Sequence, residues 1–265
     1  MRFVQLAFGV FGIIAGCHLT GAQQFKSSAP VDAILASEKV DATFVLMDVT
    51  SGELTVSNAT RAQRRYVPAS TFKIPNTLIF LDAGVVRDID EVIPYGGKPQ
   101  RFKAWEHDMP LREAMPISAV PIYQELARRV GLARMAAAVT TLNYGNNQIG
   151  DVVDKFWLVG PLEISAIEQA RFLARLVQYQ LPVSPRAVNA VEEITQQEKS
   201  EDAEVHYKTG WQGPEGAQTA WLIGWVRRGD GVSTFAFNFK MFTLSDGPKR
   251  WQITRKCLVA LGKLK

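Results

Sequence analysis

The chain has 265 residues, of which 47% are hydrophobic, and a formal net charge of +4 at pH 7; this length suits one large domain or two closely packed lobes. Its three arginine pairs, at 64–65, 128–129 and 227–228, are scattered, so they indicate solvated surface and argue against a nucleic-acid-binding protein. The three histidines show neither H-x-H nor H-E-x-x-H spacing, which argues against a zinc hydrolase, and we expect no metal. The lack of a G-x-S-x-G motif argues against hydrolases with a Ser-His-Asp triad.

The N-terminus has the features of a secretory signal. Arg2 is followed by an apolar segment, Phe3–Ala15, and then by small residues, which is the pattern of an export signal. Cleavage after Thr20-Gly21-Ala22 would remove residues 1–22 and leave residues 23–265 as a single domain of two lobes. We therefore expect a soluble protein of the bacterial periplasm. Nothing after the signal is long and apolar enough to predict a membrane span.

A second route of export is open. Ile14-Ala15-Gly16-Cys17 looks like a bacterial lipobox, in which case residues 1–16 would be removed and Cys17 would be lipidated. The protein would then be anchored to the outer membrane by its lipid. Removal of the signal by ordinary cleavage leaves Cys257 as the only cysteine, so it has no partner for an intramolecular disulfide and reads as a small buried apolar residue.

The elements predicted in chain order begin and end with strands and have helices between them. Two short strands, Ala42–Met47 and Leu54–Ser57, come first. Amphipathic periodicity then predicts helices at Thr71–Leu81, Pro121–Arg129, Leu132–Leu142, Ser165–Tyr179 and Pro185–Gln197. Gly84 is the expected C-cap of the first of these helices, in which Pro75 is tolerable only near the first turn. Three strands near Val205–Thr209, Ala220–Val226 and Thr234–Phe239 and a helix at Trp251–Leu261 close the chain.

This order predicts an α/β fold of the α+β type. Strands from both ends of the chain should pair in one antiparallel sheet flanked by the terminal helices, and the central helices should form a second, all-helical lobe. Ligand sites commonly form in a cleft between lobes.

Ser70-Thr71-Phe72-Lys73 opens the first long helix. Residues three apart share a helix face, so Lys73 can reach the Ser70 hydroxyl, and serine is a poor nucleophile unless a base lies beside it. The start of a helix also favours a developing oxyanion. Taken alone, the pattern is weak because S-x-x-K occurs by chance, and a helix that begins at a serine and turns its lysine toward water is then the favoured interpretation.

Further motifs follow in a fixed order. They are Ser118-Ala119-Val120-Pro121, Tyr144-Gly145-Asn146, Phe156-Trp157-Leu158, Lys208-Thr209-Gly210-Trp211 and the segment Trp221–Trp225. An S-x-x-K motif, then a short serine motif, then K-T-G is the order seen in serine β-lactamases and penicillin-binding proteins. Over most of the mature chain the sequence resembles the class D (OXA-type) serine β-lactamases, of the penicillin-recognising serine hydrolase family.

The resemblance implies a β-lactamase/transpeptidase-like fold and hydrolysis of β-lactam antibiotics, namely penicillins, with oxacillin and carbapenems left open. A penicillin-binding sensor that is acylated without turnover, or a D,D-transpeptidase domain, is the alternative. The expected partners are β-lactam small molecules, with no nucleic acid, and a homodimer is left open.

The resemblance also implies the catalytic roles. Ser70 would be the nucleophile, and Lys73 would be carboxylated by CO2 to N6-carboxylysine and act as general base, with no dissociable cofactor. The indole N–H of Trp157 would hold that carbamate. Ser118, lying between Lys73 and Lys208, would pass a proton to the leaving nitrogen; capping of the following helix is its simpler role.

The remaining implied residues would bind the substrate. The family's carboxylate site corresponds to Lys208, Thr209 and Arg250, although Lys249 beside Arg250 leaves the register open. The backbone N–H groups of Ser70 and Trp211 would form the oxyanion hole.

Several other residues would shape the cleft. Gly210 would let the substrate lie close to the strand, and Tyr144 would form part of the cleft wall. Among the apolar neighbours of Lys73, Val120 and Leu158 should help to desolvate it and lower its pKa. Trp105, with Phe102, is a candidate for an apolar rim.

Overall fold

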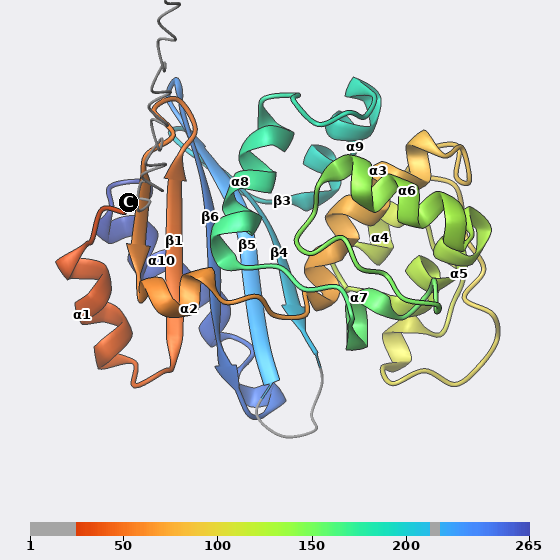
Figure 1. Cartoon of the computed structure of the whole chain (residues 1–265), viewed down its shortest axis with the longest axis horizontal. Coiled ribbons are helices and arrows are strands. Elements are labelled where there is room, and N and C mark those ends of the chain that lie inside the picture. The colour runs from red at the N-terminus through yellow and green to blue at the C-terminus, as the bar shows by residue number, and fades with distance from the viewer. Residues whose placement is uncertain (1–24, 213–217) are drawn as a thin grey trace, which may run out of the picture.

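The computed structural model describes residues 25–212 and 218–265. Its centre is a six-stranded sheet in the order β2-β1-β6-β5-β4-β3, with helices on both sides (Figure 1). The strands are β1 (Ala42–Asp48), β2 (Leu54–Ser57), β3 (Gln196–Lys199), β4 (Glu204–Trp211), β5 (Gln218–Arg228) and β6 (Gly231–Met241). All neighbouring strands are antiparallel, and β1 pairs with β6. Strands from the two ends of the chain therefore share one sheet, as the sequence predicts.

The α-helices are α1 (Ala29–Ser37), α2 (Ala59–Gln63), α3 (Lys73–Asp82), α4 (Leu111–Ala114), α5 (Val120–Val130), α6 (Leu132–Leu142), α7 (Phe156–Val159), α8 (Ala166–Val177), α9 (Pro185–Thr195) and α10 (Lys249–Ala260). Most of the α-helices lie between β2 and β3 in the sequence, with α1 before the first strand and α10 after the last. Short 3-10 helices lie at η1 (Ala69–Phe72), η2 (Lys103–Trp105) and η3 (Leu244–Asp246). Figure 1 shows α3 to α7 gathered beside the β4 side of the sheet, which is the all-helical lobe that the sequence predicts. No helix within residues 25–212 and 218–265 combines the length and the apolar character needed to cross a bilayer.

Both faces of the sheet are covered. α1 and α10 pack on one face, where Leu35, Leu222 and Ile253 belong to one buried cluster. α8 lies on the other face, where the Thr234 hydroxyl of β6 donates a hydrogen bond to the α8 carbonyl of Ala170 at 2.8 Å. Because helices cover both faces of the sheet, both sets of side chains along a central strand are buried. Strand β5 is accordingly buried without a break from residue 220 to residue 226.

Helix α3 ends within one residue of the predicted position but begins two residues later than predicted, because residues Ala69–Phe72 form the 3-10 helix η1. Pro75 is its third residue, where the backbone N–H would have no partner within the helix, so the proline costs no hydrogen bond. At the other end, Gly84 has a φ of +64°. The N–H groups of Gly84 and Val85 donate to the carbonyls of Leu81 and Phe80, which is the Schellman arrangement.

The prediction for the last central helix is wrong at its C-terminal end. The sequence pattern carries this helix to Gln197, whereas α9 ends at Thr195 and Gln196 pairs with His206 as the first residue of β3. The four residues of β3 are polar and all exposed, so they lack the apolar alternation that identifies a strand in a sequence. The sequence pattern also gave no range for α1, which Ser28 caps. The predicted signal falls in residues 1–24, outside the described residues.

Candidate active site

The S-x-x-K motif lies in the protein interior, at the junction of η1 and α3. Ser70 belongs to η1, and Lys73 is the first residue of α3. Lys73 Nζ donates a hydrogen bond to Ser70 Oγ at 3.0 Å, as the spacing of three residues predicts. Ser70 is 9% exposed and Lys73 is 0% exposed, so the solvent-facing alternative for this lysine is excluded.

The surroundings of Lys73 favour its neutral form. Burial lowers the pKa of Lys73 from 10.5 to about 7, because a charged amine loses its hydration in the interior. The centre of the Tyr123 ring lies 4.9 Å from Lys73 Nζ, and this cation–π contact offsets part of the free-energy cost of burying the ammonium form. At neutral pH a substantial fraction of this amine is therefore unprotonated, and an unprotonated amine can accept a proton or react as a nucleophile.

Ser118 lies at the opposite side of the same site. Lys208 Nζ donates to Ser118 Oγ at 2.8 Å and to the Thr209 carbonyl at 2.9 Å. Burial, followed by the charges of Lys73 and Arg250, lowers the pKa of Lys208 well below its ordinary value. The predicted contact of Ser118 with Lys208 is present, whereas the described residues show no hydrogen bond between Ser118 and Lys73. The prediction that Ser118 caps α5 is wrong, because Ala119 is the N-cap residue and no side chain caps this helix.

Two non-glycine residues beside these motifs have left-handed backbone. Ala69 has a φ of +50° and Ser118 a φ of +62°, conformations that cost on the order of 1 kcal/mol or more and that cluster at active sites. The indole N–H of Trp221, on β5, donates to the Val67 carbonyl at 3.0 Å and so ties the segment before Ser70 to the sheet. Trp221 is thus a positioning residue for the nucleophile.

Gly210 allows strand β4 to lie directly against the nucleophile segment. A Cβ atom at this position would lie 2.8 Å from the Pro68 carbonyl oxygen and 3.0 Å from Thr71 Cγ2, which is closer than such atoms approach. The sequence analysis attributed this glycine to contact with the substrate. The structure shows that the close approach is made by the chain's own backbone, and that it brings Thr209 and Trp211 beside Ser70.

Arg250 is placed at the cleft from the first turn of α10. Its Nε donates to the Gly247 carbonyl at 3.0 Å, and its Nη1 lies 3.5 Å from the Gly210 carbonyl. Lys249 instead forms an ion pair with Asp246 at 2.8 Å and does not line the cleft. The structure thus resolves the register, because Arg250 is the cation that faces the site.

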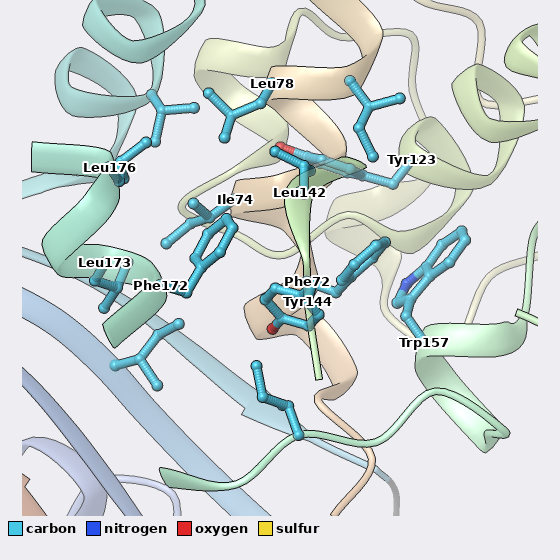
Figure 2. Packing of buried hydrophobic residues seen from close by; sticks show 14 of the residues in the cluster. Phe72, Ile74, Leu78, Tyr123, Leu142, Tyr144, Trp157, Phe172, Leu173 and Leu176 are labelled. Carbon is cyan, nitrogen blue, oxygen red and sulfur yellow. The ribbon is translucent and has the colours of Figure 1, made fainter. Parts of the chain in front are cut away.

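Trp157 carries a buried donor without an acceptor. The side chain is 0% exposed, and its ring stacks on Phe72 at 6.0 Å (Figure 2). Its Nε1 has no hydrogen-bond partner among the described residues. An unpaired buried N–H costs about 1–3 kcal/mol, and the indole N–H groups of Trp211 and Trp225 are likewise unpaired among the described residues.

The Tyr144-Gly145-Asn146 motif is structural. Tyr144 is fully buried, and its hydroxyl donates to Gln169 Oε1 at 3.1 Å, so the prediction that it forms part of the cleft wall is wrong. Gly145 has the Glu163 carbonyl only 2.1 Å from where a Cβ would lie. The Asn146 side chain donates to the Pro161 carbonyl at 2.8 Å and accepts from the Glu163 N–H at 3.1 Å. The motif therefore fixes the segment that follows Trp157.

The predicted residues meet at one cleft of about 620 Å³. Its lining includes Ser70, Trp105, Ser118, Val120, Leu158, Thr209, Gly210, Trp211 and Arg250, while Lys73, Trp157 and Lys208 lie beneath this surface, at most 3% exposed. The sequence analysis missed other lining residues, namely Arg101, Ala104, Pro116, Ile117, Val159 and Leu244. Within the described parts of the chain, no group of three His, Cys, Asp or Glu side chains is placed to hold a metal ion.

Comparison with known proteins gives one family. The model of the penicillin binding protein transpeptidase domain matches residues 42–258. Beta-lactamase OXA-5 from Pseudomonas aeruginosa is 42% identical over 230 residues, which cover 86% of this chain and 86% of that relative. Beta-lactamase OXA-48 from Klebsiella pneumoniae is 37% identical over 237 residues, which cover 89% of each.

A solved structure gives the same result. FUS-1 (OXA-85), a class D β-lactamase from Fusobacterium nucleatum subsp. polymorphum, has a TM-score of 0.87 and 37% sequence identity, with coverage of 91% of this chain and 100% of that one. Enzymes of this class need no dissociable cofactor. These matches agree with the sheet and helical lobe of the fold and with the contact between Ser70 and Lys73. The chain belongs to the class D β-lactamases.

Proposed function

We propose that the protein hydrolyses β-lactam antibiotics through a covalent acyl-enzyme on Ser70. The observation that carries this proposal is the 3.0 Å contact of Ser70 Oγ with Nζ of a fully buried lysine, Lys73. Because burial brings the pKa of that lysine to about 7, a base is available beside the nucleophile at neutral pH. Membership of class D supports the same chemistry.

Acylation uses groups that already lie together. Loss of the Ser70 proton toward Lys73 lets Oγ attack the β-lactam carbonyl carbon, and the C–N bond of the ring then breaks. The departing nitrogen takes a proton from the Ser118 hydroxyl, and Ser118 Oγ regains one from the ammonium group of Lys208, whose Nζ lies 2.8 Å away. The backbone N–H groups of Ser70 and Trp211 are the proposed donors to the carbonyl oxygen, whose negative charge develops in the transition state.

The cationic end of the cleft suits the carboxylate of the β-lactam nucleus. Arg250 lines the cleft beside Thr209, and Lys208 lies directly beneath it. A guanidinium can bind a carboxylate through two parallel hydrogen bonds, and the Thr209 hydroxyl can add a third. These contacts would orient the ring so that its carbonyl faces Ser70.

Lys73 is proposed to carry a carbamate, N6-carboxylysine. The neutral amine adds CO2 and releases one proton, and the buried, unpaired N–H of Trp157 would donate to the new oxygen atoms. The carbamate would supply an anionic general base for both acylation and the hydrolytic water. Val120 and Leu158, which line the cleft near this point, would restrict access of bulk water to Lys73.

Counting turnovers tests the proposed function. The purified protein, mixed with an excess of a chromogenic cephalosporin, should open many molecules of substrate per molecule of protein at a constant rate. A single burst of one equivalent would contradict hydrolysis and would indicate instead the penicillin-binding sensor or the D,D-transpeptidase.

Export to the bacterial periplasm is proposed from the signal in residues 1–22. The Cys17→Ser variant should leave the amount of soluble, processed protein unchanged, because cleavage after Ala22 does not use this thiol. Cell fractionation and the N-terminal mass of the mature protein give the answer. If the wild type is found in the membrane fraction and the variant becomes soluble, the lipobox is the true signal and residues 1–16 are the leader.

A further inference from the structure

Arg101 is a cation at the mouth of the cleft that has no acidic partner among the described residues. Its guanidinium carbon lies 5.2 Å from the centre of the Trp211 ring and 5.2 Å from that of Phe102, and its side chain lines the cleft. It forms no hydrogen bond or ion pair with the residues that the structure describes.

The turn that carries Arg101 is anchored on both sides. The Glu106 carboxylate accepts from the Gln100 N–H at 3.2 Å and from the Lys103 ammonium. The indole N–H of Trp105 donates to the Ile117 carbonyl at 3.0 Å, which fixes the turn against the segment before Ser118. Arg101 is thus exposed but held in one region of the cleft mouth.

The stacking of Arg101 leaves its donors available. A guanidinium that packs its flat face on aromatic rings keeps its N–H groups in the plane and free to bind a carboxylate bidentately. No Asp or Glu occurs among the described residues that line the cleft, whereas Arg101 and Arg250 both do. The cleft therefore has two separate guanidinium groups, of which the carboxylate of the β-lactam nucleus uses one.

The chemistry of the substrate places a second group near Arg101. The N–H of Trp211 is a proposed donor to the scissile carbonyl, and the acylamino side chain of a penicillin is attached to the carbon next to that carbonyl. This side chain therefore lies near Trp211, whose ring Arg101 covers. We infer that Arg101 forms an anion subsite that favours β-lactams whose acylamino side chain carries its own carboxylate. This inference rests on the proposed acylation of Ser70.

A matched pair of substrates isolates the effect. Benzylpenicillin and its α-carboxybenzyl analogue differ only by one carboxylate on the acyl side chain. For each we would measure the second-order rate constant of acylation, which is defined whether or not the acyl-enzyme is later hydrolysed. The variants are Arg101→Gln and Arg101→Lys, with Arg64→Gln as control, because Arg64 is also an exposed arginine stacked on an aromatic ring, Tyr66 at 5.3 Å, but does not line the cleft.

In Arg101→Gln the ratio of the rate constant for the α-carboxybenzyl analogue to that for benzylpenicillin should fall on the order of three- to tenfold, the size expected for a partly exposed ion pair. Arg101→Lys should retain part of the preference, Arg64→Gln all of it, and added salt should reduce the ratio in the wild type. Arg250→Gln should slow both substrates alike, because both carry the carboxylate of the nucleus.

Two results would overturn the subsite: an unchanged ratio in Arg101→Gln, or an equal loss with both penicillins, which would make Arg101 a purely structural support for Trp211. A wild type that is acylated but not turned over would contradict hydrolysis and leave the subsite standing, so the two proposals fail separately. A wild type that neither penicillin acylates would overturn both.

Discussion

The Ser70→Ala variant should lose β-lactam turnover by about 10⁴-fold or more, because removal of the nucleophile in serine hydrolases has effects of that size or larger. The fold should survive the change. Among the described residues, Ser70 Oγ accepts a side-chain hydrogen bond only from Lys73, so loss of this hydroxyl should alter the free energy of unfolding by only about 1 kcal/mol. Steady-state kinetics and thermal unfolding measure the two effects separately.

Mass spectrometry supplies the direct test of this assignment. The wild type treated with a slowly hydrolysed β-lactam should carry the adduct on the peptide that contains Ser70, and the variant should carry none. Ser200→Ala is a suitable control, because Ser200 is an exposed, hydrogen-bonded serine that does not line the cleft. An adduct on another peptide, or turnover that persists in Ser70→Ala, would rule out Ser70 as the nucleophile.

The second large effect concerns the carbamate at Lys73. With a pKa of about 7, the amine is protonated below this pH and neutral above it. Only the neutral amine takes up CO2, so activity should fall as the pH falls through 7 and should be low after degassing at pH ~6. Added bicarbonate should restore it, and carbon-13 NMR with labelled bicarbonate should show one carbamate signal. If bicarbonate and pH leave the rate unchanged and no signal appears, Lys73 acts as a plain amine.

Trp157→Phe tests the donor that would hold this carbamate. The variant keeps an aromatic ring to stack on Phe72 but removes the N–H, and a hydrogen bond to a charged group contributes about 1.5–3 kcal/mol. Hydrolysis of the acyl-enzyme should therefore slow by about 10- to 100-fold, with a weaker carbamate signal that high bicarbonate partly restores. Trp225→Phe is the matched control, since Trp225 is equally buried with an unpaired Nε1 but stacks on His206. Equal losses in the two variants would mean that only packing had been changed.

The parts of the fold that the sequence predicted are those with local signals. Apolar runs identified β1, β5 and β6, and a serine followed three residues later by Glu168 marks the start of α8, where the structure has a complete capping box at Ser165. The contact of Lys73 with Ser70 follows from the geometry of a helical turn, so it could also be predicted from the sequence. β3 was missed because its polar residues pair with β4 through the backbone alone, and the residue sequence does not record such pairing.

The features of the site that escaped prediction depend on distant parts of the chain. Ser118 does not cap α5 because Ala119 occupies the N-cap position, and neither this shift nor the left-handed backbone of Ser118 can be predicted from a serine and its neighbours. The packing reason for Gly210 could not be predicted, because the atom that excludes a Cβ belongs to Pro68, more than a hundred residues earlier in the sequence. Arg101 has no motif around it, and only the folded chain brings it over Trp211.

The burial of Lys73 ties the reaction to the stability of the core. Phe72, adjacent to Lys73, has its ring 5.1 Å from Tyr144 and 5.2 Å from Phe156. Truncating such an aromatic ring costs about 3–5 kcal/mol, and it would also admit water to the amine and raise its pKa.

In contrast to the surroundings of Lys73, the mouth of the cleft is exposed and contributes little to stability. Phe102 and Leu244 are 36% and 54% exposed, and surface substitutions usually change stability by only about 0.5 kcal/mol. Substitutions at the rim can therefore alter which β-lactams fit at little cost in stability, whereas substitutions in the interior that makes the lysine reactive would cost both stability and activity.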